Sequence, residues 1–435
     1  MSAELGRRSL LRGGLVAAAG AAVGAAGGLA GGAALVSNGA LPGAGGAAPA
    51  GGPSEGGTSA QTANLAGGGD STVGSGGLGA ARIDAASAAA LGRQPGVSTP
   101  PGAHAIFRAY RLKQGTDARR LRGWLRLLSD DAARLMEGRP VLADVEPELG
   151  DAPANMTVTL GLGRGAVERS GASAPAWLAP LPKYKIDRLQ ARWGEADLLV
   201  QMSSDDPLTL AHADRVIQRE SEPFATVAWV QEGFRHARGA RPDGTTMRNL
   251  FGQVDGTSNP VPGTEDFDSV VYREGVGVFG AGSTSLVLRR IVLDLDGWDE
   301  VDRSAREDAV GRDLPTGAPL TGGSEHSDID FTAQKQGWDV VADFAHARRA
   351  RTGDDAQRIY RRGFNYNNPA ASGDERAGLL FATYQADPVK QYHPIQERLA
   401  QLDMMNEWTH PVGSAVFWIP PAASEGGFLG EGLFA

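Results

Sequence analysis

A polar, glycine-rich loop near the middle of the chain gathers residue types that could do chemistry. It spans residues 248–260 and contains the run Gly-Gln-Val-Asp-Gly-Thr from 252 to 257. The loop could be a tight turn, because Asp-Gly and Asn-Pro are common turn dipeptides. A calcium loop would use Asp255, Thr257 and Asn259, but it requires glycine at its sixth position, where this chain has Pro260. The third interpretation makes Asp255 a buried carboxylate beside a reactive centre.

A second polar group, further along the chain, combines one histidine with several arginines. His346 lies among alanines and precedes Arg348 and Arg351, and Arg361 follows shortly after. Because the chain has no cysteine, a haem iron would need His, Tyr or Met as its axial ligand. His346 fits that role, with nearby arginines available for the haem propionates. A lone histidine, however, is more often a structural residue than a ligand.

Taken together, the two groups resemble the dye-decolourising peroxidase family, and in particular its twin-arginine-exported subgroup, the deferrochelatase/peroxidases. The resemblance rests on the run 252–257, on His346 with Arg348, and on Arg361-Arg362-Gly363. Shorter matches extend it over residues 101–435; they lie at 248–250, 316–320, 378–381 and 412–417. The chain departs from the family pattern just after His346, where the family commonly has Ile and then Asn-Pro. We therefore expect haem packing there to differ, and iron ligation to be kept.

The resemblance implies haem b, two ferredoxin-like modules and a GxxDG loop over the distal face of the haem. Asp255 matches the distal aspartate and Arg361 matches the distal arginine. His346 matches the proximal ligand of the haem iron. Two further groups would lie beside the haem, namely Gly256, Thr257 and Ser258 at its edge and Arg351, Thr352 and Gly353 after the proximal histidine.

Asp255 and Arg361 would have complementary roles in splitting peroxide. Heterolysis needs a base that moves a proton from one peroxide oxygen to the other, and positive charge where negative charge develops. An ionised carboxylate supplies the first and a guanidinium the second. Because the ordinary pKa of an aspartate is about 4, an aspartate in this role predicts an acidic optimum for substrate oxidation.

Three functions could use these residues. The first is a peroxidase that reduces hydrogen peroxide and oxidises dyes, phenols or other organic donors. The second is deferrochelatase-type release of iron from haem in an iron-uptake system, with an iron permease as partner, and the third is a non-catalytic exported haem binder. A carrier would need only His346 and a pocket, so the presence of both Asp255 and Arg361 favours the enzyme.

Other residues near these motifs have weaker claims to a function. Bulky dyes cannot reach a buried haem edge, so their oxidation would need electron transfer through a surface aromatic residue. Trp338, Tyr360 and Tyr366 lie near the motifs, although core packing is the simpler role for each. The acidic run 325–330, which includes His326, resembles a non-haem metal site but lacks helical spacing.

The elements that must position the motifs follow an α+β pattern. Alternation of apolar and polar residues predicts strands at 103–112, 156–163, 197–202 and 225–231, with helices at 117–137 and 208–220. The second half repeats the type of pattern, with strands at 285–295, 378–384 and 414–419 and helices at 301–310 and 394–402. This order favours two ferredoxin-like modules with antiparallel sheets, a dimeric α/β-barrel-like fold, with the haem between a sheet and helices.

Composition limits the partners and locates the folded part of the chain. The chain has 435 residues, a formal net charge of −9 and no cysteine. Thiolate metal sites and disulfide scaffolds are therefore excluded, and the acidic balance argues against nucleic acid as a partner. All aromatic residues (8 Trp, 7 Tyr and 13 Phe) lie after residue 100, so we expect the core to begin there.

The first residues resemble a twin-arginine export signal, with Arg7-Arg8 followed by Ser-Leu-Leu and a glycine-rich apolar stretch. We predict a signal peptide over 1–50, whose cleavage point the sequence does not determine, and an unstructured Gly/Ala/Ser-rich linker over 51–100. The N-terminal module would span 101–260 and the C-terminal module 261–435. We expect a periplasmic, surface-associated or extracellular protein without stable membrane insertion, which forms a homo-oligomer and uses hydrogen peroxide with an organic reductant.

Overall fold

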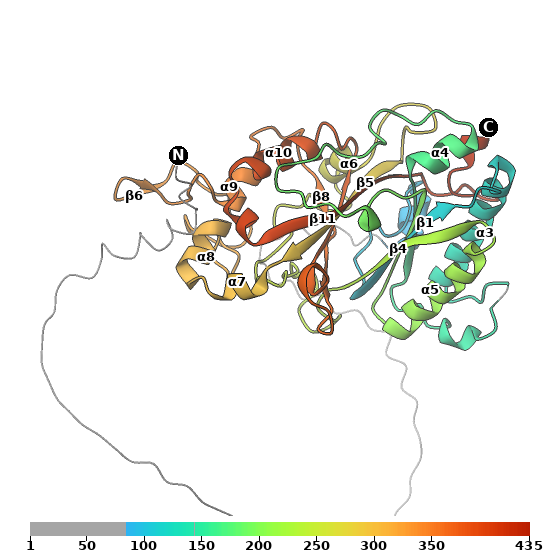
Figure 1. Cartoon of the computed structure of the whole chain (residues 1–435), viewed down its shortest axis with the longest axis horizontal. Coiled ribbons are helices and arrows are strands. Elements are labelled where there is room, and N and C mark those ends of the chain that lie inside the picture. Colours follow the sequence, from blue (N-terminus) through green and yellow to red (C-terminus); the bar gives the residue numbers. More distant parts are fainter. Residues whose placement is uncertain (1–83, 143) are drawn as a thin grey trace, which may run out of the picture. The chain divides into compact units, whose positions relative to one another are not determined.

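The computed structural model describes residues 84–142 and 144–435 (Figure 1). The predicted signal peptide and the linker up to residue 83 lie outside the described residues. In the part of the chain that is described, no helix combines the length and the apolar character that a membrane crossing requires.

The N-terminal module is a four-stranded antiparallel sheet covered on one face by two long helices. Its strands are β1 (His104–Leu112), β2 (Thr157–Leu162), β3 (Leu198–Ser204) and β4 (Ala225–Phe234), in the order β2-β3-β1-β4. The covering helices are α3 (Ala118–Met136) and α5 (Pro207–Ser221), and the short α4 (Arg164–Ser170) follows β2. Asp117 and Asp206 cap the two long helices by accepting backbone N–H groups of the first turn.

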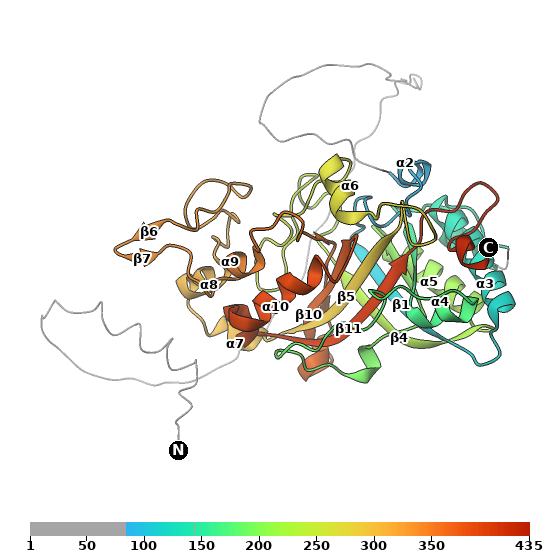
Figure 2. The same cartoon turned by 90° about the horizontal axis from the view of Figure 1, so that it is seen from above.

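The C-terminal module repeats the same strand order with different connections. Its strands are β5 (Thr284–Leu293), β9 (Phe364–Asn367), β10 (Ala377–Gln385) and β11 (Thr409–Ile419), in the order β11-β5-β10-β9. The two-residue β8 (Tyr360–Arg361) also pairs with β10. Its helices are α7 (Leu295–Asp299), α8 (Arg303–Val310), α9 (His346–Ala350) and α10 (Tyr392–Leu402), and α6 (Glu265–Val271) precedes β5. Figures 1 and 2 both show α8, α9 and α10 grouped at the end of the fold away from α3 to α5.

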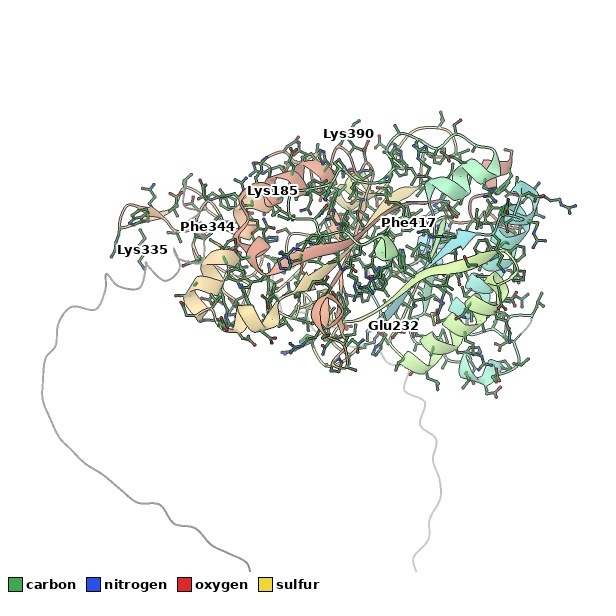
Figure 3. All side chains as sticks on the ribbon, in the orientation of Figure 1. Lys185, Glu232, Lys335, Phe344, Lys390 and Phe417 are labelled. Atoms are coloured by element: carbon green, nitrogen blue, oxygen red, sulfur yellow. The ribbon has the colours of Figure 1, made fainter. Side chains whose placement is uncertain are left out.

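The two sheets close into one barrel through two short seams. Phe234 of β4 pairs with Asn365 of β9, and Leu162 of β2 pairs with Trp418 of β11, with one residue pair at each seam. Phe107, Phe364 and Phe417 are among the apolar side chains that fill the interior. In Figure 3, the labelled Phe417 marks this region.

The strands and helices expected from the sequence are present, with ends that differ by a few residues, and the α+β fold with two ferredoxin-like modules is confirmed. The prediction of an unstructured linker up to residue 100 is wrong at its C-terminal end. Residues 85–90 form α2 (Ala85–Ala90), and the chain that follows is tied to the barrel. Gln94 hydrogen-bonds both backbone groups of Leu160, and Val97 is fully buried in the barrel interior. This short segment has no core of its own, but it packs against the core of the barrel.

Candidate active site

Asp255 is presented by a tight hairpin whose shape follows from its glycines and one asparagine. Arg248 pairs with Val254, and the backbone N–H of Asp255 donates to Met247 at 2.8 Å. Asn249 holds the turn, because its side-chain oxygen accepts the N–H groups of residues 251 and 253. Gly256 has φ +134°, a conformation that L side chains rarely adopt, so the chain changes direction directly after the aspartate.

Arg361 reaches the hairpin from β8 and forms an ion pair with Asp255. Its Nη1 lies 3.0 Å from Oδ1 of Asp255, and the side chains of Asp255 and Arg361 are 13% and 23% exposed. Because successive side chains of a strand point to opposite faces, Arg362 points the other way, into the barrel. There its guanidinium donates to the carbonyl oxygens of Thr99 and Pro100.

Asn259 connects the loop of Asp255 with the strand of Arg361. Its Oδ1 accepts the backbone N–H of Arg361 at 3.0 Å, and its Nδ2 donates to the Arg361 carbonyl at 2.7 Å. The amide thus pairs with Arg361 as a neighbouring strand would. The two hydrogen bonds from Asn259 fix the backbone of Arg361, and the ion pair with Asp255 fixes its guanidinium.

His346 begins α9 and is oriented by a buried carboxylate. Its Nδ1 lies 2.6 Å from Oδ2 of Asp403, which is 4% exposed and directly follows α10. The other oxygen of Asp403 accepts the N–H of Met405 at 2.9 Å, so the carboxylate is held from both sides. Nδ1 is therefore occupied, and Nε2 is the atom that faces outward as a potential ligand.

Opposing influences act on the pKa of His346. Burial would lower this pKa most, but the charge of Asp403 and the hydrogen bond to it raise the pKa above its ordinary value. Arg361 and Asp255 also shift it, in opposite directions. Although burial is the strongest influence, 28% of the His346 side chain remains accessible.

Positive charge gathers near His346 and Arg361. Arg312 is buried and donates to the carbonyl oxygens of Gly317 and Glu325 at 2.8 Å each. Burial lowers the pKa of Arg312, and the nearby charges of Arg351 and Arg361 lower it further. Guanidinium groups gathered in this way favour an anionic ligand such as the two carboxylates of a haem. An imidazole nitrogen on one side and arginines nearby match the donor set that haem requires.

The structure places the other predicted residues less centrally. The hydroxyl of Thr257 donates to Glu325 at 3.1 Å, and Ser258 is exposed. Arg351 is exposed at the C-terminal end of α9, and Thr352 hydrogen-bonds within its own turn, to Asp354. The described contacts join Asp255 to Arg361 and His346 to Asp403, and they do not join Ser258 or Thr352 to either pair.

Sequence reasoning missed Asp403, Asn249, Asn259 and Glu325. Asn259 lies inside the predicted loop, so its position was a usable signal. No sequence signal marks Asp403 except its place just after a predicted helix, because its partner His346 is 57 residues away. A small apolar cluster joins the two sides of the site, since Phe251 of the hairpin stacks on Trp298 at 4.7 Å and Met405 belongs to the same cluster.

The structure also shows how exposed the candidate electron-transfer aromatics and the acidic run around His326 are. Tyr360 and Tyr366 are buried as expected, but Trp338 is 80% exposed, so a core role for it is wrong. It belongs to the hairpin of β6 (Gln334–Lys335) and β7 (Trp338–Asp339), whose Lys335 lies at the outer end of the fold in Figure 3. His326 is 71% exposed, and the described residues contain no group of three His, Asp or Glu side chains that could hold a metal ion.

Comparison with known proteins gives two matching family models. Residues 94–235 match the family model "Dyp-type peroxidase, N-terminal" and residues 246–424 match "Dyp-type peroxidase, C-terminal". The loop of Asp255 thus falls in the C-terminal match, and not in the N-terminal module to which we assigned it.

Among curated relatives, a dye-decolorizing peroxidase of Thermobifida fusca is 34% identical over 82% of this chain and 86% of its own length. A deferrochelatase of Yersinia pestis bv. Antiqua is 30% identical over 78% of this chain and 83% of its own.

Solved structures give the same result. A DyP-type peroxidase from Cellulomonas bogoriensis superposes with a TM-score of 0.75 at 45% identity, covering 79% of this chain and 96% of that one. A DypB variant from Rhodococcus jostii RHA1, solved in complex with heme, shares the fold at 18% identity and a TM-score of 0.57, over 76% and 97% of the two chains. The chain therefore belongs to the DyP-type peroxidase family, which is a family of enzymes.

Proposed function

We propose that the protein is a haem b peroxidase that reduces hydrogen peroxide and oxidises dyes, phenols or other organic donors. The observation that carries this proposal is the ion pair of Asp255 and Arg361, whose charges both act on the pKa of His346. A haem carrier would have no need for a paired carboxylate and guanidinium near the histidine that binds the iron.

His346 would hold the haem iron through Nε2, and Arg312 and Arg351 would face the haem carboxylates. When bound, haem supplies an iron that can accept and pass on electrons. The chain's contribution on this side is to fix the imidazole, because Asp403 accepts the Nδ1 proton and makes Nε2 a better electron donor.

Asp255 would move the proton during peroxide cleavage. One of its oxygens is held by Arg361 at 3.0 Å, whereas the other accepts only a long contact of 3.4 Å from Asn249. The second oxygen, Oδ2, is therefore the one free to take a proton from peroxide and return it to the leaving oxygen. Arg361 would hold the other oxygen of Asp255 and stabilise the negative charge that develops as the O–O bond breaks.

The test is the absorption spectrum of haem-reconstituted protein before and after one equivalent of hydrogen peroxide at mildly acidic pH. We expect a shift of the Soret band in the wild type, slowed by about 10²–10⁴-fold in Asp255→Asn because the base is lost while the shape is kept. Asp206→Asn, the same substitution at the N-cap of α5, where asparagine caps as well as aspartate, is the matched control. Haem binding without any spectral change in wild type would refute the peroxidase.

A second candidate is the release of iron from haem, which the relatives named deferrochelatase support. The discriminating measurement is porphyrin fluorescence after anaerobic incubation with haem and no peroxide. Iron-free porphyrin would favour this role, and haem that stays intact and unreactive would favour a simple binder.

We further propose export by the twin-arginine route to a periplasmic, surface-associated or extracellular location, and assembly into homo-oligomers. The Arg7-Arg8 pair supports export. Replacing both arginines with lysine should retain the protein in the cytoplasm, which fractionation would detect, and sedimentation analysis of the exported protein would give its oligomeric state.

A further inference from the structure

The first half of α3 carries a row of like charges on its solvent side. This arginine row consists of Arg119, Arg122 and Arg126, all exposed and spaced at i, i+3 and i+7, away from the buried face of the helix. Residues 111–126 contain six basic side chains and one acidic one, Asp117, which caps the helix. Like charges at these spacings repel one another, so the row costs stability in the isolated chain.

The arginine row lacks the carboxylates that accompany other helical arginines. Three such arginines pair with a carboxylate at i and i+4: Arg134 with Asp130, Arg164 with Glu168, and Arg303 with Glu307. Among the described residues, no carboxylate pairs with Arg119 or Arg122. Arg126 has one at 4.0 Å, Glu431, and both side chains are about half exposed. The positive charge of the row is therefore largely unneutralised within the chain.

A patch of the opposite sign lies around the start of α8. Residues 299–308 contain five acidic and two basic side chains, and both basic ones pair within this segment. The remaining acidic side chains are exposed and have no cationic partner in the part of the chain that is described. They form the acidic patch: Glu300, Asp302 and Asp308. Figures 1 and 2 both show α3 and α8 at opposite ends of the fold.

The negative charges of the acidic patch also repel one another. Partial burial, and then the charges of Asp302 and Glu307, raise the pKa of Asp308. The helix cannot relieve this repulsion by moving, because its other face is fixed in the core, where Ala309 and Val310 are almost fully buried. The patch is thus held in place with an excess of negative charge, and a positive surface from outside the chain would stabilise it.

The arginine row and the acidic patch match in sign and in length. At a rise of 1.5 Å per residue, the row from Arg119 to Arg126 is about 10 Å long, and the segment from Asp302 to Asp308 about 9 Å. Guanidinium and carboxylate groups form strong paired hydrogen bonds. The chain carries a net charge of −9, so two copies repel each other unless a local positive surface meets a negative one. The arginine row is such a surface.

We propose that the arginine row of one copy docks on the acidic patch of a second copy of this chain. The inference rests on the proposed homo-oligomer, whose contact surfaces it names, and it does not depend on the peroxidase activity. Because the two surfaces differ, two copies can form both contacts at once as a two-fold pair, or each copy can bind the next in a series. Exposed ion pairs are individually weak and screened by salt, so the assembly forms at low ionic strength and dissociates at high ionic strength.

The test is sedimentation velocity of the full chain at about 20 mM and about 500 mM sodium chloride, where the screening length differs severalfold. At low salt we expect at least about twice the monomer mass, and at high salt the monomer. Arg119→Glu with Arg122→Glu should be monomeric at both, and so should Glu300→Lys with Asp308→Lys. An equimolar mixture of these two variants should assemble again, because each then offers the charge that the other lacks.

The substitutions are chosen to preserve the helices. Glutamate near the start of α3 and lysine in the last turn of α8 both suit the helix dipole, so neither variant should have a lower Tm than wild type. The matched control is Arg215→Glu with Arg238→Glu, an equal change of charge at exposed arginines outside both surfaces. Assembly should persist in this control. Its loss would show that net charge, and not the named contact, governs association.

The outcomes separate the contact from the proposals around it. Assembly that is unchanged in Arg119→Glu with Arg122→Glu, or a mixture of the two variants that stays monomeric, would overturn the contact and leave the homo-oligomer standing. A wild type that is monomeric at low salt would overturn both. If that monomer instead bound vesicles of anionic lipid through the arginine row, the row would serve a membrane surface and the contact would again be refuted. The Soret change after peroxide should be equal in all these variants, so its absence in wild type would refute the peroxidase alone.

Discussion

The two modules share one strand order but differ in what covers their sheets. In the N-terminal module, residues 113–156 connect the first two strands mainly through the single 19-residue helix α3. In the C-terminal module, the equivalent connection, residues 294–363, is divided among α7, α8, the β6–β7 hairpin and the five-residue α9. The long helix seals its sheet with Leu121, Trp124 and Leu128, all fully buried. In the C-terminal module, several short elements take the place of one long helix, and the last of them, α9, begins with His346. The candidate site therefore lies where the C-terminal module lacks a continuous covering helix.

The largest effect should distinguish two histidine–aspartate pairs among the described residues, one in each module. His346 pairs with Asp403 at 2.6 Å, and His212 of α5 pairs with Asp144 at 2.9 Å. We expect His346→Gln to abolish the Soret band in a haem titration, because the ligand atom is lost. His212→Gln should bind haem normally and lose only about 1–3 kcal/mol of stability. Equal haem affinity of the two variants would contradict the assignment of the iron ligand.

The second largest effect is expected from core substitutions, which should lower stability in both modules but slow the reaction with peroxide only in the C-terminal module. Trp124 is fully buried and stacks on Phe224 at 5.7 Å. Trp124→Ala should lower the free energy of unfolding by about 3–5 kcal/mol in urea titrations and leave the haem spectrum unchanged. Phe251→Ala, in the cluster beneath the Asp255 hairpin, should both destabilise the protein and slow its reaction with peroxide. If both variants slowed that reaction alike, the division of roles would be refuted.

A pH effect on stability should arise in the N-terminal module from one buried carboxyl group. Burial, followed by the charges of Glu220 and Asp130, raises the pKa of Asp131 in α3 to about 7. The folded state then binds a proton more tightly than the unfolded state does, so stability falls as pH rises from about 4 towards 7. Asp131→Asn should remove this loss, and thermal unfolding at pH 5 and pH 8 would measure it. An unchanged difference in Tm between the two pH values would count against the buried carboxyl as its source.

The smallest effect should come from the clamp between the Asp255 loop and Arg361. Asn259→Ala removes both hydrogen bonds to the Arg361 backbone and should slow the Soret change after peroxide by about tenfold, since the guanidinium loses its positioning. Haem affinity should not change. Asn259→Asp keeps the acceptor and loses the donor, so an intermediate rate is expected. A rate equal to wild type in Asn259→Ala would show that Asp255 alone positions Arg361.

The sequence predicted the elements well, because apolar periodicity is a local signal and both modules bury one face of each element. It also pointed to Asp255, His346 and Arg361, whose neighbours in sequence form recognisable motifs. Their roles in catalysis and ligation stay predictions until the variants above are measured. The partners that orient them were harder to find, because Asp403 and Glu325 act across tertiary contacts that no spacing reveals. The exposure of Trp338 could not be predicted for the same reason, because only the three-dimensional structure shows that its hairpin projects from the body of the protein.

The seams of the barrel set an order of events in folding. One seam, between β2 and β11, has a single residue pair, and Gln94 spans it by hydrogen-bonding Leu160 on one side and the Pro420 carbonyl on the other. The first folded residues and the last strand must therefore meet before the ring is complete, so closure waits for the whole chain to be synthesised. Contacts between such distant segments form late and open first. Backbone amides along this seam should thus exchange with deuterated solvent faster than those at the centre of either sheet, and the barrel would open there, leaving both four-stranded sheets whole.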